Sequence, residues 1–348
     1  MMENNKRKRI IYIDILNIIS IFAVVLLHHN GIVRFYSASR AWKTSLIVET
    51  AFFWAAPVFL MISGSMLMGY RKKYDTKTFF KKRFTKVLIP FAFWTVVMTI
   101  WKVHIKQLVI DKYSIVNLVN IILNYQEEPI YYFGFVIIGI YLTMPLLSNL
   151  AEDKYRNSLW FTVLLWFIFN STLPVICALF KISYNGFLKV QIGDYLIFVL
   201  LGYLLSTKDL ERKYRIVLYV LGFLSVVFRY VVTYYLSVRD GFINRTLFEY
   251  YEFHSVLLAC AVFVFIKNVN WDRFIKSEKI SKLLGKVASC SFGIYLIHII
   301  IMHYERKFCD ISIYSWQWRT IGAICTYFIS LGIILILKKI PVVKRIVA

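Results

Sequence analysis

The chain has 348 residues, of which 59% are hydrophobic, 18% are aromatic and only 18% are charged. A soluble core of this length cannot hide so much apolar surface, so the composition excludes an ordinary soluble protein and predicts an all-α, polytopic membrane helix bundle. The formal net charge of +23 could indicate nucleic-acid binding. In a membrane protein, however, the meaning of Lys and Arg depends on which loops carry them.

Apolar segments follow one another along the whole chain. We expect about ten transmembrane helices, at residues 12–30, 48–70, 87–104, 130–149, 159–179, 193–206, 216–236, 251–266, 287–304 and 319–337. The sixth segment is short for a hydrocarbon core of about 30 Å. Internal repeats and long soluble appendages are not evident, so residues 1–348 are expected to form a single membrane domain.

Basic residues gather in the segments that this order of spans places on one side. The run Lys6–Arg9 precedes the first span, and residues 71–86 between the second and third spans are rich in Lys and Arg. Cytoplasmic segments carry an excess of these residues, so both termini are expected to be cytoplasmic. The first span lacks a small-residue cleavage site, so we interpret it as an uncleaved helix.

Two further segments have local signals. In the second span, Pro57 is expected to kink or open the helix, while Ser63 and Gly64 provide small surfaces for close packing. The segment 105–129 carries apolar residues at three- and four-residue spacing, which predicts an interfacial helix on the outer leaflet.

The first span, Tyr12 to Asn30, is apolar but has charge-capable groups near its two ends. Asp14 and His28 are fourteen residues apart, which in a helix is a rise of about 21 Å and an angle of about 40° on one face. A polar stripe on a membrane helix faces protein or water rather than lipid. Alternatively, Asp14 lies at the headgroup level and His28 extends outward to the interface.

With this topology every histidine falls on the outer side of the membrane. The six are His28, His29, His104, His254, His298 and His303. Histidine can exchange a proton near neutral pH or bind a metal as neutral imidazole, so an outward-facing catalytic or metal-binding cavity is one interpretation. The other is that these amphipathic rings simply lie at the interface.

Charged residues near the two membrane surfaces suggest two further sites. Arg229 in the seventh span needs a partner, for which Glu49, Glu249 and Glu252 are candidates. At the inner side, Asp14 lies near the level of Arg83 and Lys86, and clustered cations can hold phosphate oxygens. The residues therefore predict a phosphate-compatible inner mouth and a histidine-rich outer pocket, as a reaction with an activated cytoplasmic donor would need.

Several short motifs occur in a specific order and spacing along nearly the whole chain. They are Asp14 with His28, Pro57-Val58-Phe59, Ser63-Gly64, Lys82-Arg83 with Lys86 and Pro90, IGIYLTMPLL at 138–147, LLGYLL at 200–205 and SFGIYLIH at 291–298. In this order the chain resembles the membrane-bound acyltransferase family 3, which includes bacterial surface-polysaccharide O-acetyltransferases.

The resemblance implies an O-acyltransferase in the bacterial plasma membrane. Its donor would be acetyl-CoA or another acyl-CoA from the cytoplasm, and its acceptor would be a hydroxyl of an extracytoplasmic glycan. No bound cofactor, metal or nucleic acid is expected. The implied catalytic residues are His28, Asp14, His298 and Tyr295, the CoA-binding residues are Arg83, Lys86 and Lys82, and the substrate-pocket residues are His29, Arg229, Glu252 and His254.

The chain departs from the family pattern at two places. Asn17 stands where many members carry Arg, and Ile130-Tyr131-Tyr132 stands where many show a His-Leu-Trp-like run. Two other function classes remain open. One is an exporter of polysaccharide or lipid-linked sugar, although internal repeats and paired broken helices are not detectable. The other is an outer metal or haem site formed by the histidines.

Overall fold

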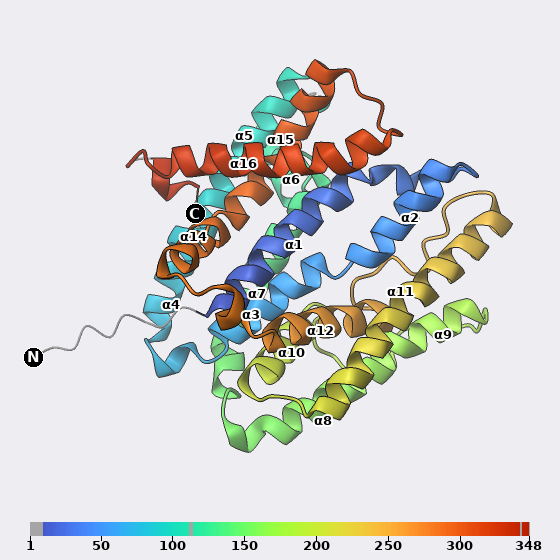
Figure 1. The fold of residues 1–348 in the computed structure, drawn as a ribbon, viewed down its shortest axis with the longest axis vertical. Helices are drawn as coiled ribbons and strands as arrows, with labels where there is room; N and C mark the ends of the chain where they lie inside the picture. Colours follow the sequence, from blue (N-terminus) through green and yellow to red (C-terminus); the bar gives the residue numbers. More distant parts are fainter. Residues whose placement is uncertain (1–9, 111–113, 342, 348) are drawn as a thin grey trace, which may run out of the picture.

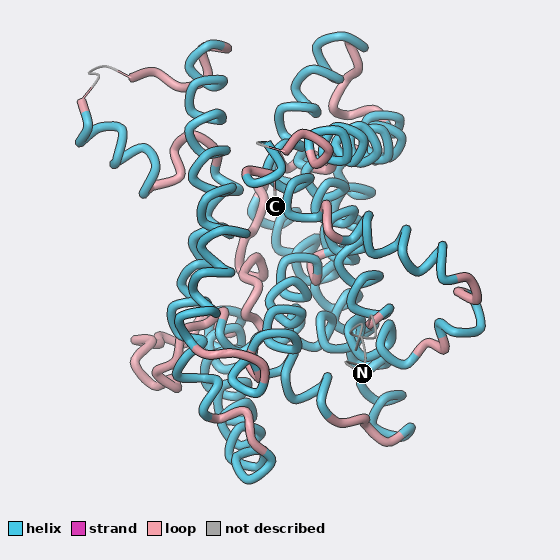
Figure 2. The backbone as a smooth tube through the Cα atoms, turned by 90° about the vertical axis from the view of Figure 1, so that its left-hand side faces the viewer, coloured by secondary structure: helices cyan, strands magenta, loops and turns pink. Residues whose placement is uncertain are grey.

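A computed structural model describes residues 10–110, 114–341 and 343–347 of the chain. The basic run Lys6–Arg9, which we expect on the cytoplasmic side, lies outside the described residues. Across the described ranges, the secondary structure is entirely helical, with loops and turns between the helices (Figure 2). This confirms the all-α fold class.

Sixteen α-helices are present in the described ranges, and several are continued by short 3₁₀ or π segments. Their bounds are α1 Ile11–His29, α2 Arg40–Phe52, α3 Ala55–Leu67, α4 Thr76–Arg83, α5 Ile89–His104, α6 Ile115–Leu123, α7 Tyr132–Asn149, α8 Arg156–Trp166, α9 Leu173–Leu179, α10 Leu196–Thr207, α11 Arg212–Asp240, α12 Phe253–Asn268, α13 Trp271–Phe274, α14 Glu278–Ala288, α15 Ser291–Cys309 and α16 Ala323–Leu337.

Within the described residues, seven helical segments are long and apolar enough to cross a membrane, and α14 with α15, bent by 55°, would make an eighth. The helices α10 and α12 are apolar but shorter. Each of the ten expected ranges coincides with one of these elements. The helices thus indicate a multi-pass membrane protein, while the count of ten and the sides of the two termini stay predictions.

Helix α1 runs through the middle of the bundle, where it contacts α2, α3, α12, α14, α15 and α16 (Figure 1). Its sequence is apolar over most of its length, and Leu16, Ile21 and Val25 are completely buried. The helix ends at His29, and the side-chain amide of the next residue, Asn30, donates to the Leu26 and Arg319 carbonyl oxygens, at 2.9 and 3.1 Å. These bonds fix the end of α1 that carries His28.

The second expected span is broken into α2 and α3 at Phe53 and Trp54. Pro57 cannot donate to the carbonyl of Phe53, and its ring crowds that carbonyl, so the helix opens there as predicted. Helix α2 begins at Arg40, earlier than the sequence indicates. The reason is that the Ser39 side chain caps it by accepting from the Trp42 amide, and Trp42 and Leu46 are buried one turn apart.

Helices α3 and α10 pack with their backbones in close contact at two glycines. A Cβ atom on Gly64 would lie 1.9 Å from the Val199 carbonyl oxygen, and one on Gly202 would lie 2.0 Å from the Met61 carbonyl oxygen. The predicted packing role of Gly64 is therefore confirmed. Helix α10 is buried on all sides from Ile197 to Leu205, which accounts for its uniformly apolar sequence.

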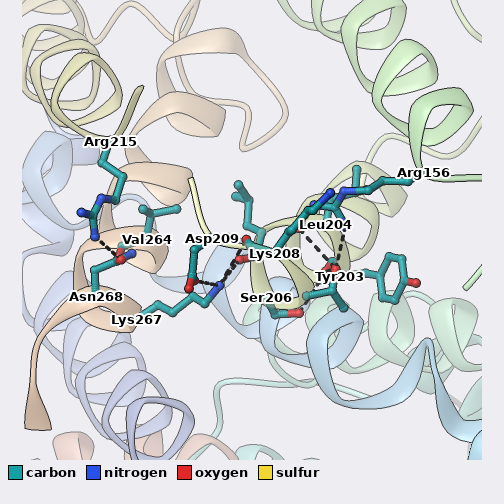
Figure 3. A network of polar contacts seen from close by, with 12 residues as sticks. Arg156, Tyr203, Leu204, Ser206, Lys208, Asp209, Arg215, Val264, Lys267 and Asn268 are labelled. Atoms are coloured by element: carbon teal, nitrogen blue, oxygen red, sulfur yellow. Dashed lines mark hydrogen bonds and ion pairs between the residues drawn. The ribbon is translucent and has the colours of Figure 1, made fainter. Parts of the chain in front are cut away.

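Cations close the carboxyl end of the short helix α10 (Figure 3). Lys267 donates to the Leu205 carbonyl oxygen at 2.8 Å and forms an ion pair with Asp209 at 2.7 Å. Arg156 donates to the Leu204 carbonyl oxygen at 2.9 Å and to Thr207. Positive charge is favourable at this end of a helix, so these contacts compensate for its small number of turns.

The interfacial segment is also helical, because α6 covers Ile115–Leu123. Its apolar residues Ile115, Val116 and Leu123 are exposed, as expected of a helix that rests on an apolar medium. Residues 111–113, within the same expected segment, lie outside the described residues. Its position on the outer leaflet stays a prediction.

Candidate active site

A cavity of about 1390 Å³ lies beside α1 and reaches residues from both ends of that helix. Asn17 and His28 both line it, and eleven residues of helix rise about 16 Å. Near Asn17 the lining includes Ser291, whose hydroxyl donates to the Asn17 carbonyl oxygen, and then Ser289, to which Lys338 donates. Arg83 and Lys86 line the cavity as well. We call this basic end the inner mouth, and the end with His28, Glu49 and Glu128 the outer end.

Two histidines meet at the outer end of the cavity. His28 lines the cavity from α1, and its Nδ1 lies 3.4 Å from Nε2 of His298 on α15. His298 is completely buried, and its Nδ1 lies 2.7 Å from the Tyr295 carbonyl oxygen and 3.1 Å from that of Ile294. Carbonyl oxygens only accept hydrogen bonds, so Nδ1 of His298 carries the proton.

This arrangement determines the tautomer of His28. When His298 is neutral and protonated at Nδ1, its Nε2 can only accept, so Nδ1 of His28 must donate to it. The lone pair of His28 is then on Nε2, the nitrogen that a proton-abstracting base would use. The structure thus brings together two of the predicted catalytic residues, with His298 behind His28 rather than in the cavity lining.

Tyrosines hold α15 against the start of α7. The Tyr295 hydroxyl donates to the Ile130 carbonyl oxygen at 2.6 Å, and the Tyr131 hydroxyl donates to the Leu296 carbonyl oxygen at 2.7 Å. Tyr295 also lines the cavity, with its ring centroid 6.2 Å from that of His298. The predicted position of Tyr295 in the same pocket as His28 agrees with this geometry.

Asp14 is the predicted catalytic residue that the structure does not bring to the others. It lies near the start of α1, about 21 Å along the helix from His28, and it is not part of the cavity lining. Fourteen residues of helix put the two groups on one face but not within reach of each other. Asp14 therefore cannot orient His28 directly.

The predicted CoA-binding residues separate into two groups. Arg83 and Lys86 line the inner mouth, from the end of α4 and the π segment Phe84–Leu88 that follows it. A wider helical turn there precedes Pro90, which has no amide hydrogen to donate four residues back. Lys82 does not line the cavity, because its ammonium group lies over the ring of Tyr74, at 3.7 Å from the centroid.

The four predicted substrate-pocket residues do not line the cavity. His29 is buried against α16, with Nδ1 2.9 Å from the Trp318 carbonyl oxygen and Nε2 2.9 Å from the Thr326 hydroxyl. The Thr326 hydroxyl is also hydrogen-bonded to Glu305. Glu252 and His254 bond each other at 2.9 Å.

Arg229 is buried directly behind the cavity wall. It donates to the carbonyl oxygens of Leu247 and Glu49, at 2.8 and 3.1 Å, and its guanidinium carbon is 3.5 Å from the Phe53 ring centroid. The Glu49 carboxylate, which does line the cavity, is 3.6 Å from Arg229. The predicted partner Glu49 is confirmed, and Arg229 supports the site through it.

Glu127 and Glu128 precede α7 at the outer end. Glu128 lines the cavity and forms an ion pair with Lys102 at 3.0 Å. Glu127 is 1% exposed, and neither carboxyl oxygen has a hydrogen-bond partner within the described ranges. Burial raises the pKa of Glu127 to about 7, and the negative charge of Glu128 adds to this rise.

Sequence reasoning missed several residues that line the cavity. Lys338, Lys344 and Arg345 near the end of the chain complete the inner mouth, and Glu49 and Glu128 give the outer end two carboxylates. The positive-inside pattern alone cannot distinguish Lys and Arg residues that line a binding site from those that only set the orientation of the chain in the membrane. Glu49 had a signal as a partner for Arg229, whereas nothing in the sequence pointed to Glu128.

Comparison with known proteins decides the family. The model of acyltransferase family 3, which is described as an acyltransferase domain, matches residues 10–337. The chain belongs to acyltransferase family 3. No curated protein matches this family member significantly, and no solved structure does either.

Membership makes the chain an acyltransferase, and the helices fit a membrane enzyme of that family. The family's match covers the segments that carry His28, Arg83, Lys86 and His298. Within the described residues, no group of three or more His, Cys, Asp and Glu side chains is placed to hold a metal ion.

Proposed function

We propose that this acyltransferase moves an acyl group, usually acetyl, from cytoplasmic acyl-CoA to a hydroxyl of an extracytoplasmic glycan. The observation that supports this is that one cavity has both a cluster of cations at its inner mouth and His28 at its outer end. A donor with phosphates on one end and a thioester on the other suits that distribution of groups. The family membership supports the reaction class.

In the proposed reaction, Arg83 and Lys86 bind the phosphates of the acyl-CoA while its thioester extends toward His28. Nε2 of His28 takes the proton from the acceptor hydroxyl, and the oxygen attacks the thioester carbonyl carbon. A carbon–oxygen bond forms as the carbon–sulfur bond breaks. The proton on His28 is then available to the departing CoA thiolate, so charge is balanced at each step.

The acceptor enters from the outer end in this scheme. Glu49 and Glu128 line that end, where their carboxylates, paired with Arg229 and Lys102, can accept hydrogen bonds from sugar hydroxyls. Aromatic side chains, including Phe53, Tyr132 and Tyr250, also line the cavity and provide flat apolar surfaces. These groups support a polyhydroxylated acceptor.

The test uses inverted membrane vesicles, in which the cytoplasmic face is outside, from cells that make the natural acceptor. Acyl-labelled acetyl-CoA is added to vesicles that carry the parent, His28→Ala or, as a matched control, His104→Ala, which changes an exposed histidine outside the cavity lining. We expect label in glycan with the parent and His104→Ala, and a rate lower by about 10²–10⁴ with His28→Ala.

Equal transfer by the parent and His28→Ala would refute the role of His28. No labelled glycan or lipid with any variant would refute transfer to that acceptor and favour the exporter, which moves the glycan without acylating it. Arg83→Gln is expected to raise the KM for acetyl-CoA. An unchanged KM would mean that the cations of the inner mouth only set the orientation of the chain in the membrane and do not bind the donor.

A further inference from the structure

The inner mouth contains more cations than the motif on α4 and α5 provides. Five line it: Arg83, Lys86, Lys338, Lys344 and Arg345. The last three come from the end of α16 and the segment after it. Within the parts of the chain that the structure describes, none of the five forms an ion pair with a carboxylate.

The segment after α16 is held against the bundle by specific contacts. The Trp94 indole nitrogen on α5 donates to the Ile346 carbonyl oxygen at 2.9 Å, and Val347 is completely buried. The Lys344 amide donates to the Ile340 carbonyl oxygen at 2.8 Å. These contacts keep Lys344 and Arg345, both exposed, at the rim of the mouth.

The cations are close enough to affect one another. Burial lowers the pKa of the Lys338 ammonium, and Lys344 and Lys86 lower it further, while Cys290 opposes the change. Lys338 donates to the Ser289 carbonyl oxygen at 2.7 Å, which holds it beside the mouth. Like charges held together without a counter-charge favour a ligand with several negative charges.

We propose that Lys344 and Arg345 form a second phosphate subsite, which binds the 3′-phosphate on the ribose of acyl-CoA. This inference rests on the proposed function. CoA carries two separated phosphate groups, and its diphosphate is nearer to the thioester than the 3′-phosphate is. Half-buried Arg83, with Lys86, suits the diphosphate, which enters the cavity first. The exposed residues Lys344 and Arg345 at the rim suit the 3′-phosphate, which enters last.

The experiment compares acetyl-CoA with 3′-dephospho-acetyl-CoA as donors in the vesicle assay. The proteins are the parent, the double variant Lys344→Gln/Arg345→Gln, and the control Lys339→Gln, which removes an exposed charge nearby that does not line the cavity. Hydrogen bonds to charged groups imply that the parent has a KM for the dephospho donor about tenfold higher or more.

The double variant should lose this discrimination: its KM for acetyl-CoA rises to that for the dephospho donor, and its kcat is unchanged. Lys339→Gln should behave as the parent. Equal KM values for both donors with the parent would overturn the subsite, as would an equal rise for both donors in the double variant.

A binding measurement separates this proposal from the proposed function. Purified parent and double variant are titrated with CoA and 3′-dephospho-CoA, without any acceptor. Tighter binding of CoA by the parent alone supports the subsite, even if no glycan is acylated and the proposed transfer fails. Equal binding of the two compounds by the parent, or binding of neither, overturns the subsite.

Discussion

Replacing His298 with leucine should slow the chemical step without changing donor binding. His298 does not line the cavity, but its Nε2 accepts from Nδ1 of His28 and so keeps the lone pair of His28 on Nε2. Leucine removes the acceptor, after which His28 is free to rotate and to change tautomer. His298 is thus a positioning residue, and the loss appears in kcat rather than in KM.

The geometry sets the size of this effect. Groups that orient a metal-ligating histidine from behind are typically worth about 10–100-fold in metal affinity or activity, and we expect the same scale for a histidine that acts as a base. The 3.4 Å between the two histidine nitrogens is longer than an ordinary hydrogen bond, so we expect the lower end of that range. A tenfold loss in kcat corresponds to about 1.4 kcal/mol in the activation free energy.

The assay measures kcat and KM for acetyl-CoA in inverted vesicles, for His298→Leu, His28→Ala and the double variant. Because both residues act through one proton transfer, the double variant should be no slower than His28→Ala alone. His298→Gln, whose side-chain oxygen can accept from His28, should recover part of the rate. His104→Leu serves as the control.

The reasoning would be refuted if the losses of the two single variants multiplied in the double variant, since that would mean independent roles. An unchanged kcat in His298→Leu would equally refute it. A raised KM with an unchanged kcat would instead show that His298 affects donor binding. Thermal unfolding of each variant in detergent distinguishes these results from a loss of folded protein.

Two further predictions concern stability. Gly64→Ala should lower the free energy of unfolding by about 1–3 kcal/mol, because the new Cβ would meet the Val199 carbonyl oxygen. Gly69→Ala should have a smaller effect, because the space around Gly69 is open. Thermal unfolding in detergent measures both variants, and equal effects would contradict the packing argument. The carboxyl of Glu127 has a pKa of about 7 in the folded protein and an ordinary value of 4.5, so the folded protein binds more protons between these values and its stability should fall as pH rises from 4.5 to 7. Glu127→Gln should reduce that fall, and an unchanged pH dependence of the unfolding temperature would show that Glu127 does not cause it.

The sequence by itself determined the all-helical class and the positions of the helices, and it indicated a multi-pass membrane protein. Long apolar runs specify helices locally, because only hydrogen bonds within the segment satisfy the backbone in lipid. The break at Pro57 and the close packing at Gly64 could also be predicted, because a missing amide hydrogen and a missing side chain have their effects at the residue itself. The order of the short motifs correctly indicated the family.

Only the tertiary structure decided which polar residues share the cavity. Residues three or four apart share a helix face, but whether that face turns toward the cavity depends on neighbouring helices far away in the chain. His29 and Arg229 lie behind the wall, while Lys344 and Arg345 reach the inner mouth because Trp94 holds the segment after α16. The sequence places residues along a helix, and packing between helices decides which of them a substrate can meet.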